Sequence, residues 1–406
     1  MDVTAATPQV RRAPPNAGIY LFLLGFLGVL IQLPLGLDAV GFGPPFEAAN
    51  VAKTLAATGN FRDPFAVPTG PTAHVAPVYP FIMATAIRVL QQPGAVVWSM
   101  ILLNAALSGL AAAMLPALSQ RIYGRRTPGI AGAVLLALST QLMPQWEVAL
   151  AAVLLLAAAL AIMDAGPVRA GLWSGACILT TPLSLPMLAL LLISRGKRFF
   201  AIGCVLALCV CAPWILRNWM VMGAPYFIRD NFGLELYISN NDKAAPDLIR
   251  NEALWTQHPN QNRAEAAVVA RMGEGPYNRM RLRDALDWMR SHPRQFLRLN
   301  AGRAFYYWMP PAGEGWHVYG YWLATVLGIA GACLGRHNRA AMLLTAGAVV
   351  WWLPFLFIQT VGRYRFPSLW VSALLAGYAI DTAAARVGSR AGRHVLDPSS
   401  APEPVS

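Results

Sequence analysis

The residues best suited to chemistry stand at the ends of apolar stretches. Glu47 is the acidic residue of GFGPPFEAANVAKTL, shortly after the first apolar run, and Glu147 opens another such run in MPQWEVALAAVLLL. A carboxylate beside a low-dielectric region can act as a general base or as a metal ligand. The helix dipole also stabilises an acid at a helix start, and a loop acid is simply solvated. Residue type alone therefore leaves the structural explanation ahead for both glutamates.

Basic and polar residues occupy comparable positions. Arg217 and Asn218 end an apolar run in PWILRN, and Arg363 and Arg365 precede another in GRYRFP. Such arginines can snorkel toward lipid phosphate, or several can converge on a substrate phosphate, and the sequence favours neither explanation over the other. His74, in TAHVAPVYP, is a lone histidine that says little by itself.

The elements that carry these residues are expected to be membrane spans. The chain has 406 residues, of which 56% are hydrophobic and 13% charged, whereas roughly a quarter of an ordinary soluble domain is charged. Several apolar runs approach or exceed the roughly 18–20 residues that cross a bilayer as a helix. The net charge of +13 is spread over basic clusters between these runs, which is typical of positive-inside topology and not of a nucleic-acid surface. The sequence predicts an all-α polytopic membrane protein.

Placing every basic cluster on the inner side predicts the organisation of the chain. We expect a disordered cytoplasmic N-terminus (1–16), a transmembrane core (17–216) with a first outer loop (38–94), an outer helical segment (217–315), C-terminal transmembrane helices (316–385) and a cytoplasmic tail (386–406). Spans are expected near 18–36, 95–119, 128–143, 146–163, 198–216, 317–335, 339–358 and 367–384. Both glutamates and both arginine motifs then lie at the same outer face.

Prolines interrupt the expected helices at three places. The stretch 170–194 has Arg169 before it and Arg195 after it, so we expect a broken helix pair that turns near Pro182. The Pro-rich stretch 64–80 is expected to be loop, followed by a short interfacial helix over 81–90. In the outer segment, Pro293 is expected to interrupt an amphipathic helix.

The order of these motifs resembles the GT-C superfamily of integral-membrane glycosyltransferases. The likeness is to the bacterial branch related to protein O-mannosyltransferases and to the aminoarabinose transferase of lipid A. It is carried by FEAANVAKTLAATGNF, PTAHVAPVYPFIMATAIRVL, YGRRTPGIAGAVLLALSTQLMPQWEVALAAVLLL, PWILRNWMVMGAPYFIRDNFGLELYISNN, SHPRQFLRLNAGRAFYYW and GRYRFPSLW, over about residues 18–385. It implies a GT-C fold with roughly 9–11 transmembrane helices, interfacial helices in the first outer loop and a small helical outer segment.

The resemblance also implies an activity. Relatives take a sugar from a polyprenyl-phosphate-linked donor, and an acid of the first outer loop is essential. Glu47 matches that acid, although Pro44 stands where the family has a leading Asp and Ala48 where it has an aromatic residue. The resemblance assigns substrate-binding roles to the residues that match its other motifs, which are Glu147, His74, Tyr79, Arg217, Asn218, Arg363 and Arg365.

The expected function is therefore glycosyl transfer at the outer face of a bacterial cytoplasmic membrane, with both termini in the cytoplasm. The expected partners are the lipid-linked donor, a glycan, glycolipid or protein acceptor, and membrane lipid, with no nucleic acid. Some relatives use a divalent metal, but two separate glutamates make a poor site without further ligands. The alternatives are a catalytically degenerate scaffold that binds lipid-linked sugars or partner proteins, and a lipid or sugar transporter.

Overall fold

The computed structural model describes residues 16–33, 46–254 and 258–395, and these are almost entirely helical. The predicted loop site of Pro44, the N-terminal 1–15 and the end of the tail lie outside the described residues. The only strand-like features among the described residues are two isolated bridges, Arg62 with Pro71 and Asp247 with Thr360. The predicted all-α fold class is confirmed.

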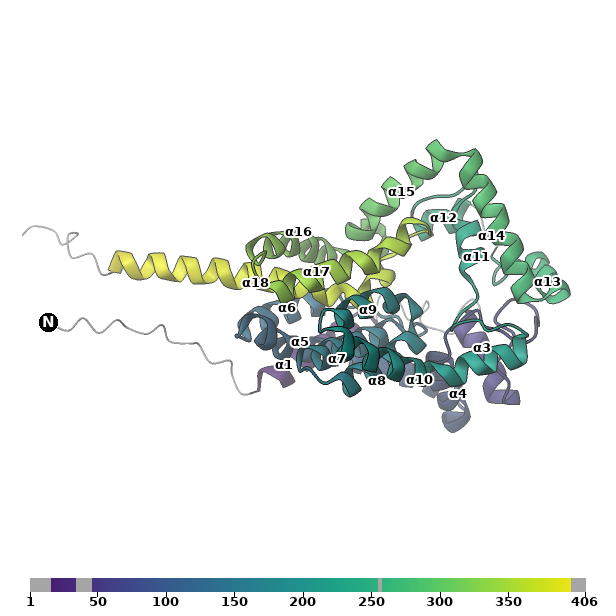
Figure 1. Ribbon diagram of the computed structural model, residues 1–406, viewed down its shortest axis with the longest axis horizontal. Coiled ribbons are helices and arrows are strands. Elements are labelled where there is room, and N and C mark those ends of the chain that lie inside the picture. Colours follow the sequence, from purple (N-terminus) through teal and green to yellow (C-terminus); the bar gives the residue numbers. More distant parts are fainter. Residues whose placement is uncertain (1–15, 34–45, 255–257, 396–406) are drawn as a thin grey trace, which may run out of the picture.

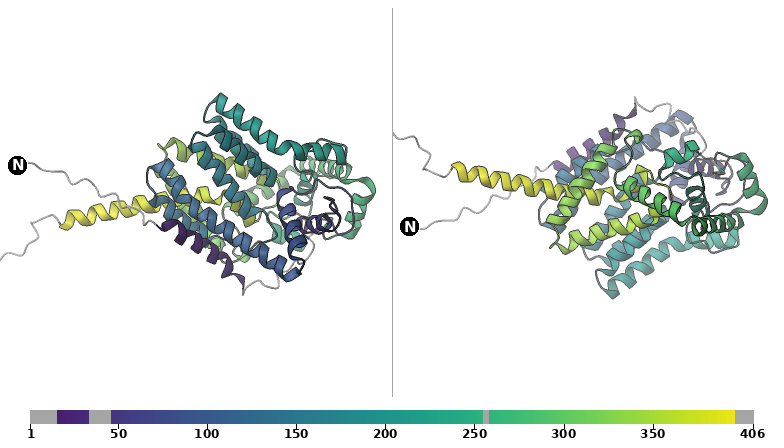
Figure 2. Two further views of the ribbon diagram at one scale, coloured as in Figure 1. Left: turned by 90° about the horizontal axis from the view of Figure 1, so that it is seen from below. Right: turned by 90° about the horizontal axis from the view of Figure 1, so that it is seen from above.

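Apolar helices form a bundle in which most axes run in roughly the same direction (Figures 1 and 2). Its members are α1 (Ala17–Leu30), α5 (Pro93–Tyr123), α6 (Thr127–Leu138), α7 (Val148–Met163), α8 (Pro167–Thr180), α9 (Leu185–Ile193), α10 (Lys197–Met222), α16 (Val318–Leu334), α17 (Arg339–Trp352) and α18 (Gly362–Val395). Among the described residues, four helical stretches are long and apolar enough to cross a membrane: Pro93–Tyr123, Lys197–Met222, Arg339–Leu356 and Gly362–Val387. The chain is an integral membrane protein.

Helix boundaries differ from the expected ones where the ends of spans carry polar residues. α10 continues past the expected end at 216 to Met222, and α18 begins at Gly362, ahead of the expected 367. α4 (Val78–Leu90) begins before the expected residue 81, because Pro80 lies in its first turn, where no backbone N–H is needed. The predicted breaks are confirmed: Thr181 ends α8, and His292 separates α14 (Glu274–Ser291) from α15 (Pro293–Trp308).

Small residues let α18 pack tightly on its neighbours. A Cβ atom added to Gly331 of α16 would collide with the backbone carbonyl of Leu375 in α18, whereas one added to Gly18 of α1 would meet nothing within 4 Å. Close approach of backbones at glycines is a common way for membrane helices to associate.

We therefore expect Gly331→Ala to destabilise the bundle by about 1–3 kcal/mol, since the added methyl group overpacks a helix contact. The measurement is the thermal unfolding midpoint of the detergent-purified protein. Gly18→Ala is the matched control and should not lower that midpoint, because the added methyl group meets nothing and alanine favours the helix. Equal midpoints for the Gly331→Ala protein and the wild type would contradict the close packing of α16 and α18.

The remaining helices gather at one end of the bundle, where two segments distant in sequence share a second core. The segments contain α3 (Glu47–Thr58) and α4 on one side, and α11 (Phe232–Ser239), α12 (Leu248–Leu254), α13 (Arg263–Met272), α14 and α15 on the other. Phe65 of the first segment packs with Leu234, Ile238, Val269 and Tyr277 of the second. This apolar contact fixes the loop after α3 against the outer segment, and the candidate site lies beside it.

Candidate functional site

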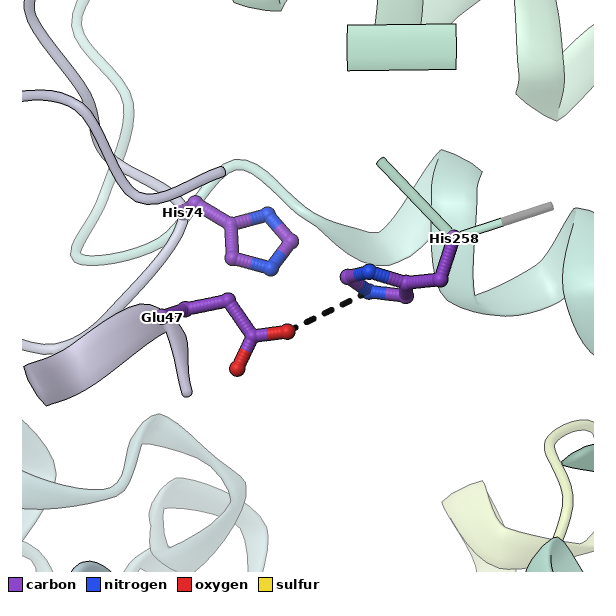
Figure 3. A group of neighbouring side chains, drawn as sticks. All are labelled: Glu47, His74 and His258. Atoms are coloured by element: carbon purple, nitrogen blue, oxygen red, sulfur yellow. Dashed lines mark ion pairs between the residues drawn. The ribbon is translucent and has the colours of Figure 1, made fainter. Parts of the chain in front are cut away.

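Glu47 is the first residue of α3, and two histidines surround its carboxylate. Ligand atoms of Glu47, His74 and His258 all lie within 4.8 Å of one another, and Figure 3 shows the three side chains converging from different parts of the chain. The Nε2 atom of His258 is 3.6 Å from Oε1 of Glu47. Phe65 contacts both imidazole rings edge-on, with ring centroids 4.8 Å from His74 and 6.1 Å from His258. One carboxylate and two imidazoles therefore lie close together, and the ring of Phe65 packs against both imidazoles.

A buried carboxyl group holds the loop that carries His74. Oε1 of Glu274, at the start of α14, accepts the Ala73 N–H at 2.7 Å, and its Oε2 accepts the Thr72 hydroxyl at 2.5 Å. The same hydroxyl oxygen accepts the His74 N–H at 2.9 Å. Glu274 is only 4% exposed. It thus fixes the backbone on the N-terminal side of His74 from the other outer segment.

The backbone carbonyls of this loop are also satisfied. Arg217 donates to the carbonyl of Thr72 at 2.7 Å. The Asp230 N–H donates to the carbonyl of Ala73, and Nε of Arg229 donates to that of His74, both at 2.8 Å. By contrast, Nδ1 of the His74 ring is buried and has no hydrogen-bond partner among the described residues. The loop is therefore held through its backbone, which leaves the His74 ring available to a ligand.

Burial sets the protonation of the three groups. It raises the pKa of Glu47, and the charge of Glu147 acts in the same direction, whereas the backbone N–H at the start of α3, Arg229 and Arg363 oppose the rise. Burial also lowers the pKa of His74 well below its usual value, with His258 and Arg229 adding to the effect. The pKa of His258 is likewise lowered by burial. Both imidazoles are neutral near pH 7, the state in which histidine binds metals.

The donor set fits a divalent metal such as zinc, for which one carboxylate and two imidazoles are usual ligands, with a further position left for substrate. One adjustment is required at His258. Its Nδ1 accepts the Asn260 N–H at 3.2 Å, so the proton of the neutral ring lies on Nε2 and faces Glu47. For Nε2 of His258 to bind a metal, the proton must move to Nδ1, and the Asn260 N–H must then turn away from Nδ1. Without a metal, the same contacts make a carboxylate–imidazole pair.

Two arginines provide the positive charge near Glu47. Arg229 and Arg363 are the cations that act on its pKa. The Arg363 guanidinium lies over the Trp146 ring, 4.0 Å from the centroid, and Trp146 in turn meets Phe46 edge-on at 5.2 Å. Nε of Arg363 is buried without a partner among the described residues. The starts of α3, α7 and α18 thus meet at one place, with a cation that has a donor to spare.

No protein-family model and no curated protein matches this sequence. Solved structures match the fold. The apo crystal structure of the Archaeoglobus fulgidus oligosaccharyltransferase superposes with a TM-score of 0.56 at 12% identity, covering 94% of this chain and 52% of that one. This chain has a GT-C-like fold.

Two further structures of oligosaccharyltransferase from Archaeoglobus fulgidus agree. The complex of AglB with an inhibitory peptide and a dolichol-phosphate gives a TM-score of 0.52 at 13% identity, covering 97% of this chain and 53% of that one. The complex with Zn and sulfate gives 0.50 at 13% identity, covering 92% and 50%. The chain therefore spans about half the length of these oligosaccharyltransferases, and the likeness is one of fold. The predicted resemblance to the O-mannosyltransferase branch stays a prediction.

Within the GT-C-like fold, four of the residues predicted from sequence come together: Glu47, His74, Arg363 and Glu147. Glu147 is the N-cap residue of α7 and its charge acts on Glu47, although its side chain makes no capping hydrogen bond. Their grouping agrees with the expected common face. Their catalytic and binding roles stay predictions.

Arg217 and Asn218 lie elsewhere, in the last turns of α10. Besides the Thr72 carbonyl, Arg217 binds the carbonyl of Phe61 at 2.7 Å and the side-chain oxygen of Asn218 at 3.1 Å. The Asn218 amide, fully buried, donates to the carbonyls of Tyr226 and Ile228. These contacts anchor the first outer loop and the start of the outer segment to α10. Their predicted role as substrate ligands stays a prediction.

Tyr79 and Arg365 are also used for packing. The Tyr79 hydroxyl donates to the carbonyl of Pro144 at 2.6 Å. Arg365 is only 1% exposed and binds the carbonyl of Trp308 and the hydroxyls of Thr325 and Ser372, at 2.7–3.0 Å. Both hold neighbouring elements together, and a substrate role for them stays a prediction.

Sequence reasoning missed His258 and Arg229. His258 stands in a polar stretch and Arg229 follows the apolar residues of APYFIRDN, and only the contact between the two outer segments brings them to Glu47. One signal was available: the chain has just six histidines, so a second one in the outer segment was a candidate partner for His74.

The carboxyl group that holds the His74 loop gives a pH prediction. Burial raises the pKa of Glu274 to about 8, against the hydrogen bonds from Thr72 and Ala73. The folded protein then keeps this proton to higher pH than the unfolded chain does. The stabilisation is complete below pH about 4.5 and is lost as the pH rises toward 8, by about 1.4 kcal/mol per unit. Unfolding midpoints of the wild type should therefore fall more steeply over this window than those of Glu274→Gln.

Asp287→Asn is the control for that comparison, because the Asp287 side chain is 74% exposed and its ion-pair partner is Arg290, which keeps its charge over this window. It should follow the wild-type pH curve. Parallel curves for wild type and Glu274→Gln would show that Glu274 does not titrate in this range.

Proposed function

We propose that this protein transfers a sugar from a polyprenyl-phosphate-linked donor to an acceptor hydroxyl at the outer face of a bacterial cytoplasmic membrane. The observation that carries the proposal is the meeting of Glu47 with two neutral imidazoles at one end of a GT-C-like helical bundle. A solved structure of an archaeal oligosaccharyltransferase with this fold is a complex with an inhibitory peptide and a dolichol-phosphate. That supports a lipid-linked donor here, and leaves the acceptor as a glycan, glycolipid or protein.

Glu47 is the proposed general base. The acceptor hydroxyl gives its proton to the Glu47 carboxylate while its oxygen forms a bond to the anomeric carbon of the sugar. The bond from that carbon to the phosphate oxygen breaks, and its electron pair leaves with the lipid phosphate. The raised pKa of Glu47 suits this role, because a base works best when its pKa lies near the working pH.

Arg229 and Arg363 are the proposed partners of the departing phosphate. Their charges are the ones that lower the pKa of Glu47. Fixed positive charge is most useful where negative charge develops in the transition state. The Nε–H group of Arg363 has no partner among the described residues and can donate a hydrogen bond to the phosphate. The ring of Trp146 beneath Arg363 holds the guanidinium in place.

A divalent metal at Glu47, His74 and His258 is the proposed cofactor. When bound, it would act as a Lewis acid on an oxygen of the donor or acceptor. The archaeal oligosaccharyltransferase was crystallised with Zn, which supports a test of zinc first. Backbone hydrogen bonds and the ring of Phe65 hold His74 in place whether or not the metal is present.

The experiment is a transfer assay with the purified full chain in detergent and bacterial membrane extract as acceptor. A panel of radiolabelled polyprenyl-phosphate sugars serves as donor. Transfer of label with any one donor, absent from heat-treated protein, supports the proposal. Binding of a donor without transfer would instead favour a catalytically degenerate scaffold. In a separate assay with the protein in sealed vesicles, uptake of the labelled donor without transfer would favour a transporter.

A further inference from the structure

A cavity of about 320 Å³ lies at the other end of α3 from Glu47. It is formed where the end of α3, the loop that follows, α4 and the last turns of α10 meet, at the lower right of Figure 1. Its lining residues are Leu55, Gly59, Asn60, Phe61, Arg62, Pro71, Phe81, Trp214, Arg217 and Val221. The cavity is therefore aromatic and basic, and no acidic residue is among those that line it.

Positive charge on the cavity wall is only partly compensated. Arg62 pairs with Asp63 at 2.8 Å. The Arg217 guanidinium makes three hydrogen bonds, to the carbonyls of Thr72 and Phe61 and to Asn218. A guanidinium has five N–H groups, so two remain for an anion as far as the described residues show. The carboxyl group that acts on Arg217 is that of Glu274, whose pKa of about 8 leaves it largely neutral at pH 7.

Aromatic rings keep Arg217 in place beside the cavity. Its guanidinium carbon lies 4.9 Å from the Trp214 ring centroid and 5.3 Å from that of Phe61. Trp214 and Phe61 contact each other edge-on at 4.7 Å, and Phe81 stacks on Phe61 at 6.0 Å. Backbone carbonyls and aromatic rings therefore position the Arg217 guanidinium beside the cavity, so that it does not extend into solvent.

Apolar surface flanks the cavity on the side that faces away from the bundle. On α10, Trp219, Met220 and Val221 are 60%, 76% and 47% exposed, and on α4 Phe81 is 46% exposed. α10 is long and apolar enough to span a membrane, so its exposed side faces lipid. The cavity thus lies at the end of a membrane span, at the depth where lipid head groups meet hydrocarbon.

We propose that this cavity binds the phosphate group of an anionic membrane phospholipid. Arg62 and Arg217 contact the phosphate, and the acyl chains lie along the exposed side of α10. Guanidinium groups are well matched to phosphate, and basic pockets between membrane helices are known to hold lipid head groups.

This lipid is distinct from a glycosyl donor reacting at Glu47. α3 has 12 residues, which is about 18 Å of helix, and its far end lines the cavity. The cations that act on Glu47 are Arg229 and Arg363, and Arg217 is not among them. A lipid held here would instead brace the loop from Phe61 to Thr72, which leads into His74. The inference does not depend on whether the protein is an enzyme.

The test is native mass spectrometry of the detergent-purified full chain titrated with dioleoyl phosphatidylglycerol or with dioleoyl phosphatidylcholine. We expect one phosphatidylglycerol to bind at least about tenfold more tightly than phosphatidylcholine. Arg62→Gln should weaken that binding about tenfold, through the loss of a charge-assisted contact. Val221→Trp should fill the cavity and reduce phosphatidylglycerol binding to the level of phosphatidylcholine.

Arg294→Gln is the matched control for loss of one positive charge. Arg294 is exposed at the start of α15, far from α4 and α10 in Figure 1, so this variant should bind phosphatidylglycerol like the wild type. Equal binding of the two lipids, or undiminished binding by both cavity variants, would overturn the proposal. It would equally be overturned if inorganic phosphate alone displaced the lipid at low millimolar concentration, or if undecaprenyl phosphate bound the cavity in place of phosphatidylglycerol.

Discussion

Replacing Glu47 with Gln is expected to reduce sugar transfer by about 10²–10⁴-fold, the usual contribution of a general base. The glutamine keeps the size of the side chain and a hydrogen-bonding oxygen, but it cannot take the proton of the acceptor hydroxyl. The measurement is the initial rate of label transfer from the donor found active in the panel. Binding of that donor should change much less than the rate.

The pH profile gives this prediction a second readout. A base must be deprotonated, so the wild-type rate should fall as the pH falls through the pKa of Glu47, which burial places above its ordinary value. Asp287→Asn is the charge-matched control, since the Asp287 side chain is 74% exposed, and it should keep the wild-type rate and profile. Equal rates for wild type and Glu47→Gln would return Glu47 to the status of a structural charge and move the base elsewhere.

The fold was largely predictable because membrane-spanning helices have a distinctive apolar composition. A bilayer demands long apolar helices whose backbone groups bond internally, so hydropathy and basic clusters located most of the helices and the break at Thr181. The ends of the spans were less predictable. α10 continues through Arg217 and Asn218 because carbonyls of the outer loops satisfy both side chains, and a local pattern cannot reveal partners so distant in sequence.

The candidate site divides in the same way. Glu47 was identifiable because an acid beside an apolar run is unusual, and because its surroundings resemble a family motif. The group that completes the site, His258, belongs to another segment. Contacts between the two outer segments bring it to Glu47, among them the packing of Phe65 on α11, α13 and α14. Residue type cannot tell which polar groups are used in packing. Arg365 follows Arg363 by two residues and is buried against Trp308 and Thr325, and its expected substrate role stays a prediction.

Removing His258 is expected to abolish zinc binding at the cluster. His258→Ala leaves one carboxylate and one imidazole, and two ligands hold zinc far more weakly than three. We expect zinc bound after dialysis to fall from about one per chain to the background, as measured by mass spectrometry of the metal. His292→Ala is the matched control, because the His292 side chain is 43% exposed and lies outside the cluster.

Stability offers a readout that needs no activity. Zinc at a hundred times its dissociation constant should stabilise the wild type by about 2.7 kcal/mol, since it binds the folded state. The rise in unfolding midpoint should be absent in His258→Ala and reversed in the wild type by a chelator. Because burial lowers the pKa of both imidazoles below the usual 6.5, they stay neutral as the pH falls past that value. The loss of zinc at low pH should therefore follow the protonation of Glu47, whose pKa burial raises.

The opposite outcome would also be informative. If wild type and His258→Ala both lack zinc while wild type transfers sugar, the cluster works through its own protons. His258 would then donate Nε2–H toward Oε1 of Glu47, as the Asn260 N–H on its Nδ1 already dictates. In that case His258→Ala should move the pH profile of transfer, because the partner that faces Glu47 is lost, and added zinc should leave the rate unchanged. The metal content and the pH profile together therefore distinguish a metal site from a carboxylate–imidazole pair.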